Sequence, residues 1–207
     1  MGLDHTGGVI ERTPGAGSYA DIEREQRWLL SGLPEGVADP VEILDRYFRQ
    51  STLRLRRMQT GSSVVYKLGQ KVRHDLDRPS LVHMTNMYLT ETEFEFIGQL
   101  EGAVLLKVRW HWSVGNTTIS VDQFGGSLNG LLLAERELSP EETVSCPPPL
   151  AVADVTEDDR FSGGRLTLMN PSEAQDLLES VTRMTGLLAN PCACQVDPES
   201  PRELRGL

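Results

Sequence analysis

Apolar and charged residues alternate along much of the chain, and such alternation is typical of β-strands whose two faces differ. In residues 21–30 the side chains of Glu23, Glu25 and Arg27 fall on one face. The pattern recurs in later segments, several of them joined by short turns such as Gly115-Asn116. The expected strands are residues 21–30, 52–59, 64–72, 87–97, 103–112, 117–124 and 131–138.

Two other stretches have the apolar spacing of amphipathic helices. Residues 40–48 predict a short helix, and residues 172–188 predict a longer one that begins after the start signal Pro171-Ser172. Strands joined mostly by short turns, together with a few helices, indicate an α+β domain with a mainly antiparallel sheet.

The charged faces of these strands carry both signs, whereas the opposite faces are largely apolar. Two arrangements fit this pattern: an open sheet with one solvated face, or a closed barrel with a charged, wet interior and helices outside. The charged positions are Glu23, Glu25 and Arg27; Arg54 and Arg56; Lys67 and Lys71; Glu93 and Glu95; Lys107 and Arg109; Asp122; and Glu135 and Glu137.

A chain of 207 residues is expected to fold as one domain. Residues 1–18 are rich in glycine and lack apolar periodicity, so they are expected to be a flexible leader. Residues 190–207 have the composition of a tail. The folded domain is therefore predicted to span residues 19–189.

The net charge of -10 argues against a protein that binds nucleic acid polymers. No apolar run is long enough to span a membrane, and no signal peptide is recognisable at the N-terminus. Three cysteines, two of them in Cys192-Ala-Cys194, do not form a disulfide framework. These features predict a cytoplasmic protein without a membrane partner, either a monomer or a homodimer.

Glu23, Glu25 and Arg27 together resemble half of a site for a divalent metal and an anion. Carboxylate oxygens suit Mg²⁺ or Mn²⁺, and a guanidinium group suits phosphate. The same spacing also occurs on solvated strand faces, so the motif alone does not decide between the two.

Seven segments between residues 21 and 188, in their order along the chain, resemble the motifs of the CYTH-domain superfamily, the triphosphate tunnel metalloenzymes. The superfamily opens with Glu-x-Glu-x-Lys, and its later motifs include paired arginines and a Gly-Leu-x-x-Ala-Glu-x-Glu strand. The matching segments are Glu23-Arg-Glu-Gln-Arg27, Thr52-Leu-Arg-Leu-Arg-Arg57, Tyr66-Lys-Leu-Gly-Gln-Lys71, Glu91-Thr-Glu-Phe-Glu95, Lys107-Val-Arg109, Val121-Asp-Gln-Phe124 with Gly130-Leu-Leu-Leu-Ala-Glu-Arg-Glu137, and Asp154-Val-Thr-Glu-Asp-Asp-Arg-Phe-Ser162.

The resemblance implies an eight-stranded antiparallel β-barrel that forms a charged tunnel, flanked by helices and with a C-terminal helix. It also implies a Mg²⁺- or Mn²⁺-dependent hydrolase of inorganic triphosphate or of a compound that contains a triphosphate or diphosphate. The implied metal ligands are Glu23, Glu25, Glu135 and Glu137; the implied phosphate-binding residues are Arg54, Arg56, Lys71, Lys107 and Arg109; and the candidate catalytic residues are Arg27, with Glu93 or Glu95 to orient the attacking water.

Four departures from the motifs leave other functions open. Arg27 replaces a lysine, Glu91 an arginine, Gly69 a threonine and Asp154 a glutamate. Arginine keeps the charge but does not lose its proton at workable pH, and Glu91 would add repulsion toward phosphate. The alternatives are an enzyme similar to class IV adenylate cyclase, an enzyme similar to thiamine triphosphatase, and a protein that binds phosphate or polyphosphate without turnover.

Overall fold

The computed structural model describes residues 19–73, 80–139, 142 and 146–187. The predicted leader, residues 1–18, and the predicted tail, residues 190–207, lie outside these described residues. Among the helices that are described, none is long and apolar enough to cross a membrane.

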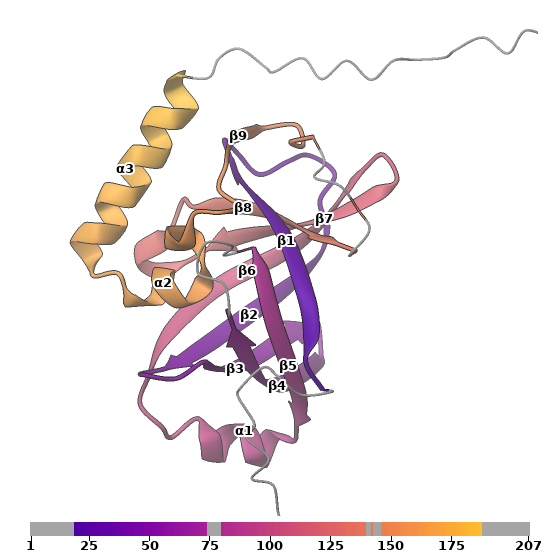
Figure 1. The fold of residues 1–207 in the computed structure, drawn as a ribbon, viewed down its shortest axis with the longest axis vertical. Helices are drawn as coiled ribbons and strands as arrows, with labels where there is room; N and C mark the ends of the chain where they lie inside the picture. The colour runs from indigo at the N-terminus through magenta and orange to yellow at the C-terminus, as the bar shows by residue number, and fades with distance from the viewer. Residues whose placement is uncertain (1–18, 74–79, 140–141, 143–145, 188–207) are drawn as a thin grey trace, which may run out of the picture.

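Eight strands close into an antiparallel barrel (Figure 1). Their order around the barrel is β5-β4-β3-β2-β6-β7-β8-β1, and pairing of β1 with β5 closes the ring. A ninth strand, β9, pairs with the end of β1. The predicted fold class is therefore confirmed, and the charged faces belong to a closed barrel. The strands are β1 (Asp21–Leu30), β2 (Ala38–Phe48), β3 (Leu53–Thr60), β4 (Ser63–Val72), β5 (Leu81–Leu89), β6 (Gly102–Val114), β7 (Thr117–Phe124), β8 (Leu132–Leu138) and β9 (Ala151–Asp154).

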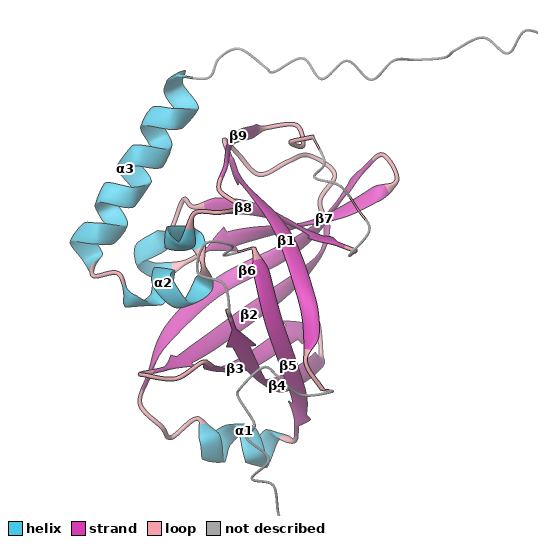
Figure 2. Ribbon diagram, viewed as in Figure 1, coloured by secondary structure: helices cyan, strands magenta, loops and turns pink. Residues whose placement is uncertain are grey.

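In the described part of the chain, three α-helices lie outside the barrel (Figure 2). Helix α1 (Glu91–Ile97) lies near one end, whereas α2 (Gly163–Leu168) and α3 (Pro171–Leu187) lie together on the side of β6 and β8. Short 3₁₀ turns at Gly126–Leu128 and Asp159–Phe161 connect the later elements. Helix α3 confirms the C-terminal helix predicted over residues 172–188.

The helix predicted over residues 40–48 is wrong, because this segment is strand β2. Its apolar positions fit a helical period, but they also fit alternation: Val41, Ile43 and Asp45 are all buried on one face. Strands β3 and β6 pair with β2 on its two edges, so tertiary hydrogen bonding decides the conformation.

The strand predicted over residues 87–97 is also wrong, since β5 ends at Leu89 and α1 begins at Glu91. Thr90 caps this helix. Its hydroxyl accepts a hydrogen bond from the backbone N–H of Glu93 at 3.3 Å, and the Glu93 carboxylate accepts one from the backbone N–H of Thr90 at 2.7 Å. The alternation of glutamates that suggested a strand is thus the first two turns of a capped helix.

Two apolar clusters hold the barrel to its surroundings. In the first, Leu29, Leu105 and Leu133 continue the inward-facing alternation of β1, β6 and β8 and pack with residues of α2 and α3 such as Leu166 and Leu177. In the second, Trp28 and other residues of the opposite strand faces pack together. The first cluster therefore fills part of the barrel interior with apolar side chains, and the rest of the interior is polar.

Candidate active site

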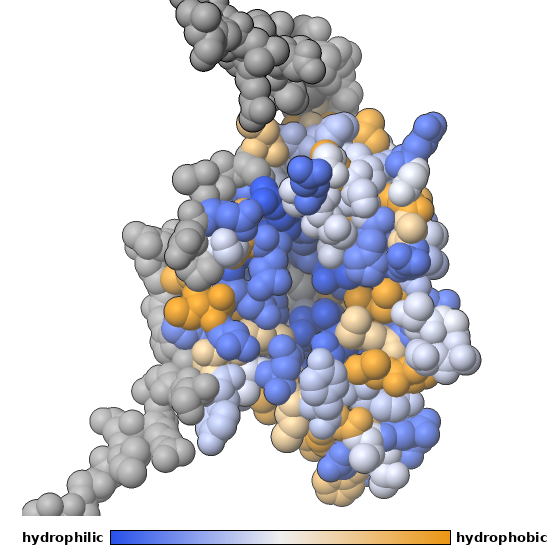
Figure 3. Space-filling model, turned by 90° about the vertical axis from the view of Figure 1, so that its right-hand side faces the viewer, coloured by the Kyte–Doolittle hydropathy of each residue, from blue (hydrophilic) through white to orange (hydrophobic). Residues whose placement is uncertain are grey.

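The polar part of the barrel interior is a cavity of about 390 Å³. Figure 3 shows hydrophilic side chains gathered around a hollow on one face of the molecule. Charged side chains of both signs line it, with basic residues in excess, so the cavity suits an anionic ligand rather than an apolar one. The basic lining residues are Arg27, Arg54, Arg56, Lys67, Lys71, Arg73, Lys107 and Arg109, and the acidic ones are Glu23, Glu25, Glu135 and Glu137.

Ten of the twelve site residues predicted from the sequence line this cavity, and the two exceptions are Glu93 and Glu95. Both exceptions lie on α1, where their side chains are exposed and Glu93 completes the cap of the helix. Glu93 and Glu95 were predicted to point into the site from a strand. Because they lie on a helix instead, they are not part of the barrel wall and do not line the cavity.

Several lining residues were not predicted as site residues, among them Tyr47, Arg73, Asn86 and Ser162. Tyr47 was missed because residues 40–48 were expected to be helical, although it follows Asp45 at the spacing of a strand face. Arg73 lies just after β4, beyond the end of the strand predicted over residues 64–72, and was therefore not assigned to a strand face.

Two buried aspartates hold the cationic side chains in place. Asp122 accepts hydrogen bonds from Nε and Nη2 of Arg109, both at 2.7 Å, and a further one from Nζ of Lys107. Asp45 accepts hydrogen bonds from Nε and Nη2 of Arg56, at 2.6 Å and 2.7 Å. Three cations are thus fixed before any ligand arrives, which lowers the cost of reorganisation on binding.

Burial alone would raise the pKa of both aspartates, but their cationic partners more than offset it. The charge and hydrogen bonds of Arg56 lower the pKa of Asp45 to about 2. Arg109 and Lys107 hold the pKa of Asp122 well below its usual range. Both carboxylates are therefore ionised across the physiological range of pH.

The folded protein is expected to lose stability in acid partly through Asp45. Because the folded pKa is about 2 and the unfolded one 3.8, the contribution is complete above the unfolded value and is lost as pH falls through the folded one. The shift corresponds to about 2 kcal/mol. Urea unfolding at pH 7 and pH 2.5 should show that Asp45→Asn has the smaller pH dependence by roughly this amount. An equal pH dependence in wild type and variant would contradict the assignment.

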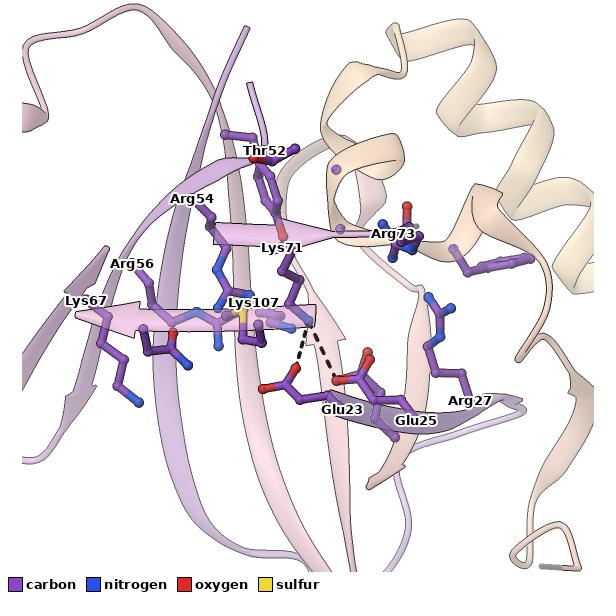
Figure 4. Close-up of a pocket in the computed structure, with 18 of the residues that line it drawn as sticks. Glu23, Glu25, Arg27, Thr52, Arg54, Arg56, Lys67, Lys71, Arg73 and Lys107 are labelled. Atoms are coloured by element: carbon purple, nitrogen blue, oxygen red, sulfur yellow. Dashed lines mark ion pairs between the residues drawn. The ribbon is translucent and has the colours of Figure 1, made fainter. Parts of the chain in front are cut away.

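Acidic residues of β1 and β8 form the opposite side of the cavity. Glu25 pairs in register with Glu137, and Arg27 with Glu135. Nζ of Lys71 lies 3.5 Å from Oε2 of Glu23 and 3.7 Å from Oε1 of Glu25 (Figure 4). This side of the cavity therefore brings several carboxylates close to one lysine.

The carboxylates on this side are held in unequal states. The charge of Lys71 lowers the pKa of Glu25 to about 2. By contrast, burial raises the pKa of Glu23, and the nearby charges of Glu25 and Glu137 raise it further despite Lys71. Repulsion among these carboxylates is a cost that a bound cation would reduce.

The acidic side of the cavity has the donor chemistry of a Mg²⁺ or Mn²⁺ site, because those ions prefer carboxylate oxygens. Within the part of the chain that the structure describes, however, no three His, Cys, Asp or Glu side chains are grouped closely enough to hold one ion. Glu23 and Glu25 are drawn to Lys71, and Glu135 to Arg109. The residues fit a cation by type and by mutual repulsion, and binding it requires them to exchange these ion pairs for metal contacts.

As far as the structure describes the chain, Arg27 and Arg54 each have a buried donor without a partner. Arg27 donates from its backbone N–H to Oγ1 of Thr156 and from Nη2 to the Thr156 carbonyl, both at 3.0 Å. Among the described residues, Nε of Arg27 and Nε of Arg54 are buried without a hydrogen-bond partner. A buried donor left unpaired is costly, so both guanidinium groups are suited to an anion entering the cavity.

Two departures from the family motifs have structural explanations. Glu91 lies on α1, where its Oε1 accepts a hydrogen bond from the Tyr66 hydroxyl at 3.1 Å, so the repulsion expected from it inside the site does not arise. A Cβ at Gly69 would lie 3.0 Å from Cε of Met84 and 3.2 Å from Oδ1 of Asn86. The glycine thus leaves room for these two lining side chains.

Comparison with known proteins gives one curated relative and a set of solved structures. No family model matches the chain. An inorganic triphosphatase of Nitrosomonas europaea (strain ATCC 19718 / CIP 103999 / KCTC 2705 / NBRC 14298) is 28% identical over 155 residues, which cover 72% of this chain and 99% of the relative. The solved structure of the inorganic triphosphatase NE1496 aligns with a TM-score of 0.51 and 24% identity, covering 72% of this chain and 96% of that one.

A second solved structure, described as the hypothetical protein NE1496, aligns with a TM-score of 0.51 and 25% identity over 71% of this chain and 98% of the other. These matches and the closed barrel confirm the resemblance to the CYTH-domain superfamily. In this CYTH-like barrel, the motifs on β1, β3, β4, β6 and β8 all bring charged residues to the cavity. Residues of the later motifs hold or complete the lining of this cavity. Asp122 accepts hydrogen bonds from two cationic side chains, Thr156 accepts one from Arg27, and Ser162 lines the cavity.

Proposed function

We propose that the chain is a metal-dependent phosphohydrolase that cleaves inorganic triphosphate, or an organic compound containing a triphosphate, inside the barrel. The observation that carries this proposal is the cavity itself: eight basic side chains converge on it, although the whole chain has a net charge of -10. The similarity to an inorganic triphosphatase supports the same class of reaction.

The arrangement of cations suits a linear chain of phosphoryl groups. A triphosphate carries roughly four negative charges near neutral pH, so it needs several cations held apart from one another. Arg56, Lys107 and Arg109 are fixed by buried aspartates, whereas Arg27 and Arg54 keep donors for the ligand. Arginine side chains grip phosphate oxygens through paired donors, which fixes the orientation of the substrate.

The acidic side of the cavity is proposed to hold the metal through Glu23, Glu25, Glu135 and Glu137. A bound Mg²⁺ or Mn²⁺ ion would supply charge neutralisation on the phosphate oxygens. One of these carboxylates would also orient the attacking water. Arg27, directly opposite Glu135 in register, would stabilise the charge that develops on the phosphoryl group.

The purified protein is expected to release phosphate from inorganic triphosphate when Mg²⁺ or Mn²⁺ is present, and to stop when EDTA removes the metal. Phosphate and pyrophosphate release should be measured in parallel from inorganic triphosphate, ATP and thiamine triphosphate, which also ranks the substrates. Restoration of activity by Mn²⁺ after EDTA treatment is the control for irreversible damage.

Two outcomes would contradict this proposal. Formation of pyrophosphate and a cyclic nucleotide from ATP would show a cyclase. Tight binding of triphosphate without turnover of any of the three compounds would show a binding protein.

A further inference from the structure

Tyr47 lies where the phosphate cavity meets α2, the helix outside the barrel. It is partly buried, lines the cavity, and packs against the apolar cluster that includes Leu105 and Phe161. A Cβ added at Gly163, the first residue of α2, would lie 2.2 Å from Oη of Tyr47 and 3.1 Å from Cζ. The phenol therefore occupies the space that any side chain at position 163 would need.

The same contact is absent one residue later. A Cβ at Gly164 would lie 3.8 Å and 3.9 Å from the nearest atoms of Tyr47, which is ordinary van der Waals contact. Two adjacent glycines of one helix thus differ in what they allow: a side chain at position 163 would collide with the hydroxyl, and one at position 164 would not.

On the sheet, Tyr47 stands directly opposite Arg54 in the pairing of β2 with β3. Asp45 accepts hydrogen bonds from Nε and Nη2 of Arg56 and lies 3.8 Å from Nε of Arg54. Among the described residues, this Nε has no hydrogen-bond partner. Asp45 therefore does not hold the Arg54 guanidinium group through a hydrogen bond to Nε. Burial and the charge of Asp45 raise the pKa of Tyr47, against the charges of Arg54 and Arg56. At neutral pH the phenol is therefore an uncharged partner for the guanidinium group.

We propose that Tyr47 is a positioning residue whose hydroxyl holds the Arg54 guanidinium toward the cavity, and that Gly163 is the position in α2 that must lack a side chain for this contact to form. The inference deepens the proposed function, on which it rests. Helix α2 would then contribute to the anion site only by leaving room for the Tyr47 hydroxyl beside Gly163, and not through a charged side chain.

The test is a double-mutant cycle on Tyr47→Phe and Gly163→Ala, with inorganic triphosphate as the probe. Affinity should be measured by calorimetry in EDTA, so that no turnover occurs, and KM and kcat should be measured with Mn²⁺. Tyr47→Phe is expected to weaken binding and raise KM by about tenfold, the value of one hydrogen bond to a charged group, while kcat changes by less than about threefold.

Gly163→Ala alone is expected to give a similar loss, because its methyl group displaces the hydroxyl. In the Tyr47→Phe background it should add less than about a twofold loss, since the oxygen at 2.2 Å is gone and Cζ, at 3.1 Å, has to shift by only a few tenths of an ångström. Gly164→Ala is the matched control and should stay within about twofold of wild type, because it meets Tyr47 only in ordinary contact.

Unchanged affinity in Tyr47→Phe, in a wild-type protein that binds triphosphate, would overturn the inference and leave the proposed function standing. Additive losses in the double variant would overturn the part assigned to Gly163. Failure of the wild-type protein both to bind triphosphate in EDTA and to turn it over with Mn²⁺ would overturn the proposed function, and this inference with it. If Gly163→Ala does not fold in a thermal scan, the affinity of Tyr47→Phe decides the role of Tyr47 by itself.

Discussion

Asp122→Ala is expected to lower the free energy of unfolding by about 3–5 kcal/mol, the cost of leaving buried charges uncompensated. Asp122 is fully buried and accepts hydrogen bonds from both Lys107 and Arg109. Burial already lowers the pKa of Lys107, and Asp122 is the first of the charges that oppose this. Without the carboxylate, Lys107 is expected to lose its proton more readily, so the cavity loses a cation along with its support.

Urea unfolding at pH 7 measures this effect, and two other variants calibrate it. Asp122→Asn keeps the shape and one acceptor oxygen, and should lie between wild type and Asp122→Ala. Asp159→Ala breaks the exposed ion pair with Arg165 and should cost at most about 1 kcal/mol. Similar losses in Asp122→Ala and Asp159→Ala would mean that the buried aspartate is not an anchor.

The second large effect is expected in catalysis. Replacing Glu23 and Glu137 together by glutamine should lower kcat by on the order of a thousandfold, because the proposed cation site loses two of its four carboxylates. Glutamine keeps the shape of the side chains, and removal of a carboxylate whose pKa is raised by burial relieves repulsion. Stability at pH 7 should therefore be unchanged or slightly higher, which separates the loss of activity from a loss of fold.

Phosphate release from inorganic triphosphate gives kcat, calorimetric titration with Mn²⁺ tests the cation site, and urea unfolding tests the fold. Glu101→Gln is the matched control, because Glu101 is an exposed carboxylate paired with Arg49 at 3.5 Å. Turnover and Mn²⁺ affinity that survive in the double variant would show that the metal lies elsewhere or that none is needed.

The charged interior could be predicted from the sequence because alternation places every second side chain on the same face. Glu135 and Glu137, or Lys107 and Arg109, need only an extended backbone to point into the same cavity, and so their positions follow from spacing alone. A closed barrel then converts faces that would otherwise be solvated into the walls of a site.

The errors arose where two local signals competed. Residues 40–48 satisfy both a helical and a strand period, and only pairing with β3 and β6, far apart in sequence, selects the strand. Residues 87–97 alternate acidic and aromatic side chains, but Thr90 and Glu93 also form a capping box, and that local hydrogen bonding starts a helix. The supporting roles of Asp45 and Tyr47 depended on recognising β2, so both were missed.

Strand β1 has a consequence for the order of folding. It pairs with β5 through residues 21–24, with β8 through residues 24–29 and with β9 through residues 28–30. During synthesis it is the first of the described strands to leave the ribosome, yet β8 and β9 emerge much later. Both edges of β1 therefore stay unpaired until these partners have been synthesised. The long stretch of chain between β1 and its partners also slows their pairing. Since β1 carries Glu23, Glu25 and Arg27, the site is completed only when the ring closes, and a partly folded chain has no finished cavity in which to hold phosphate.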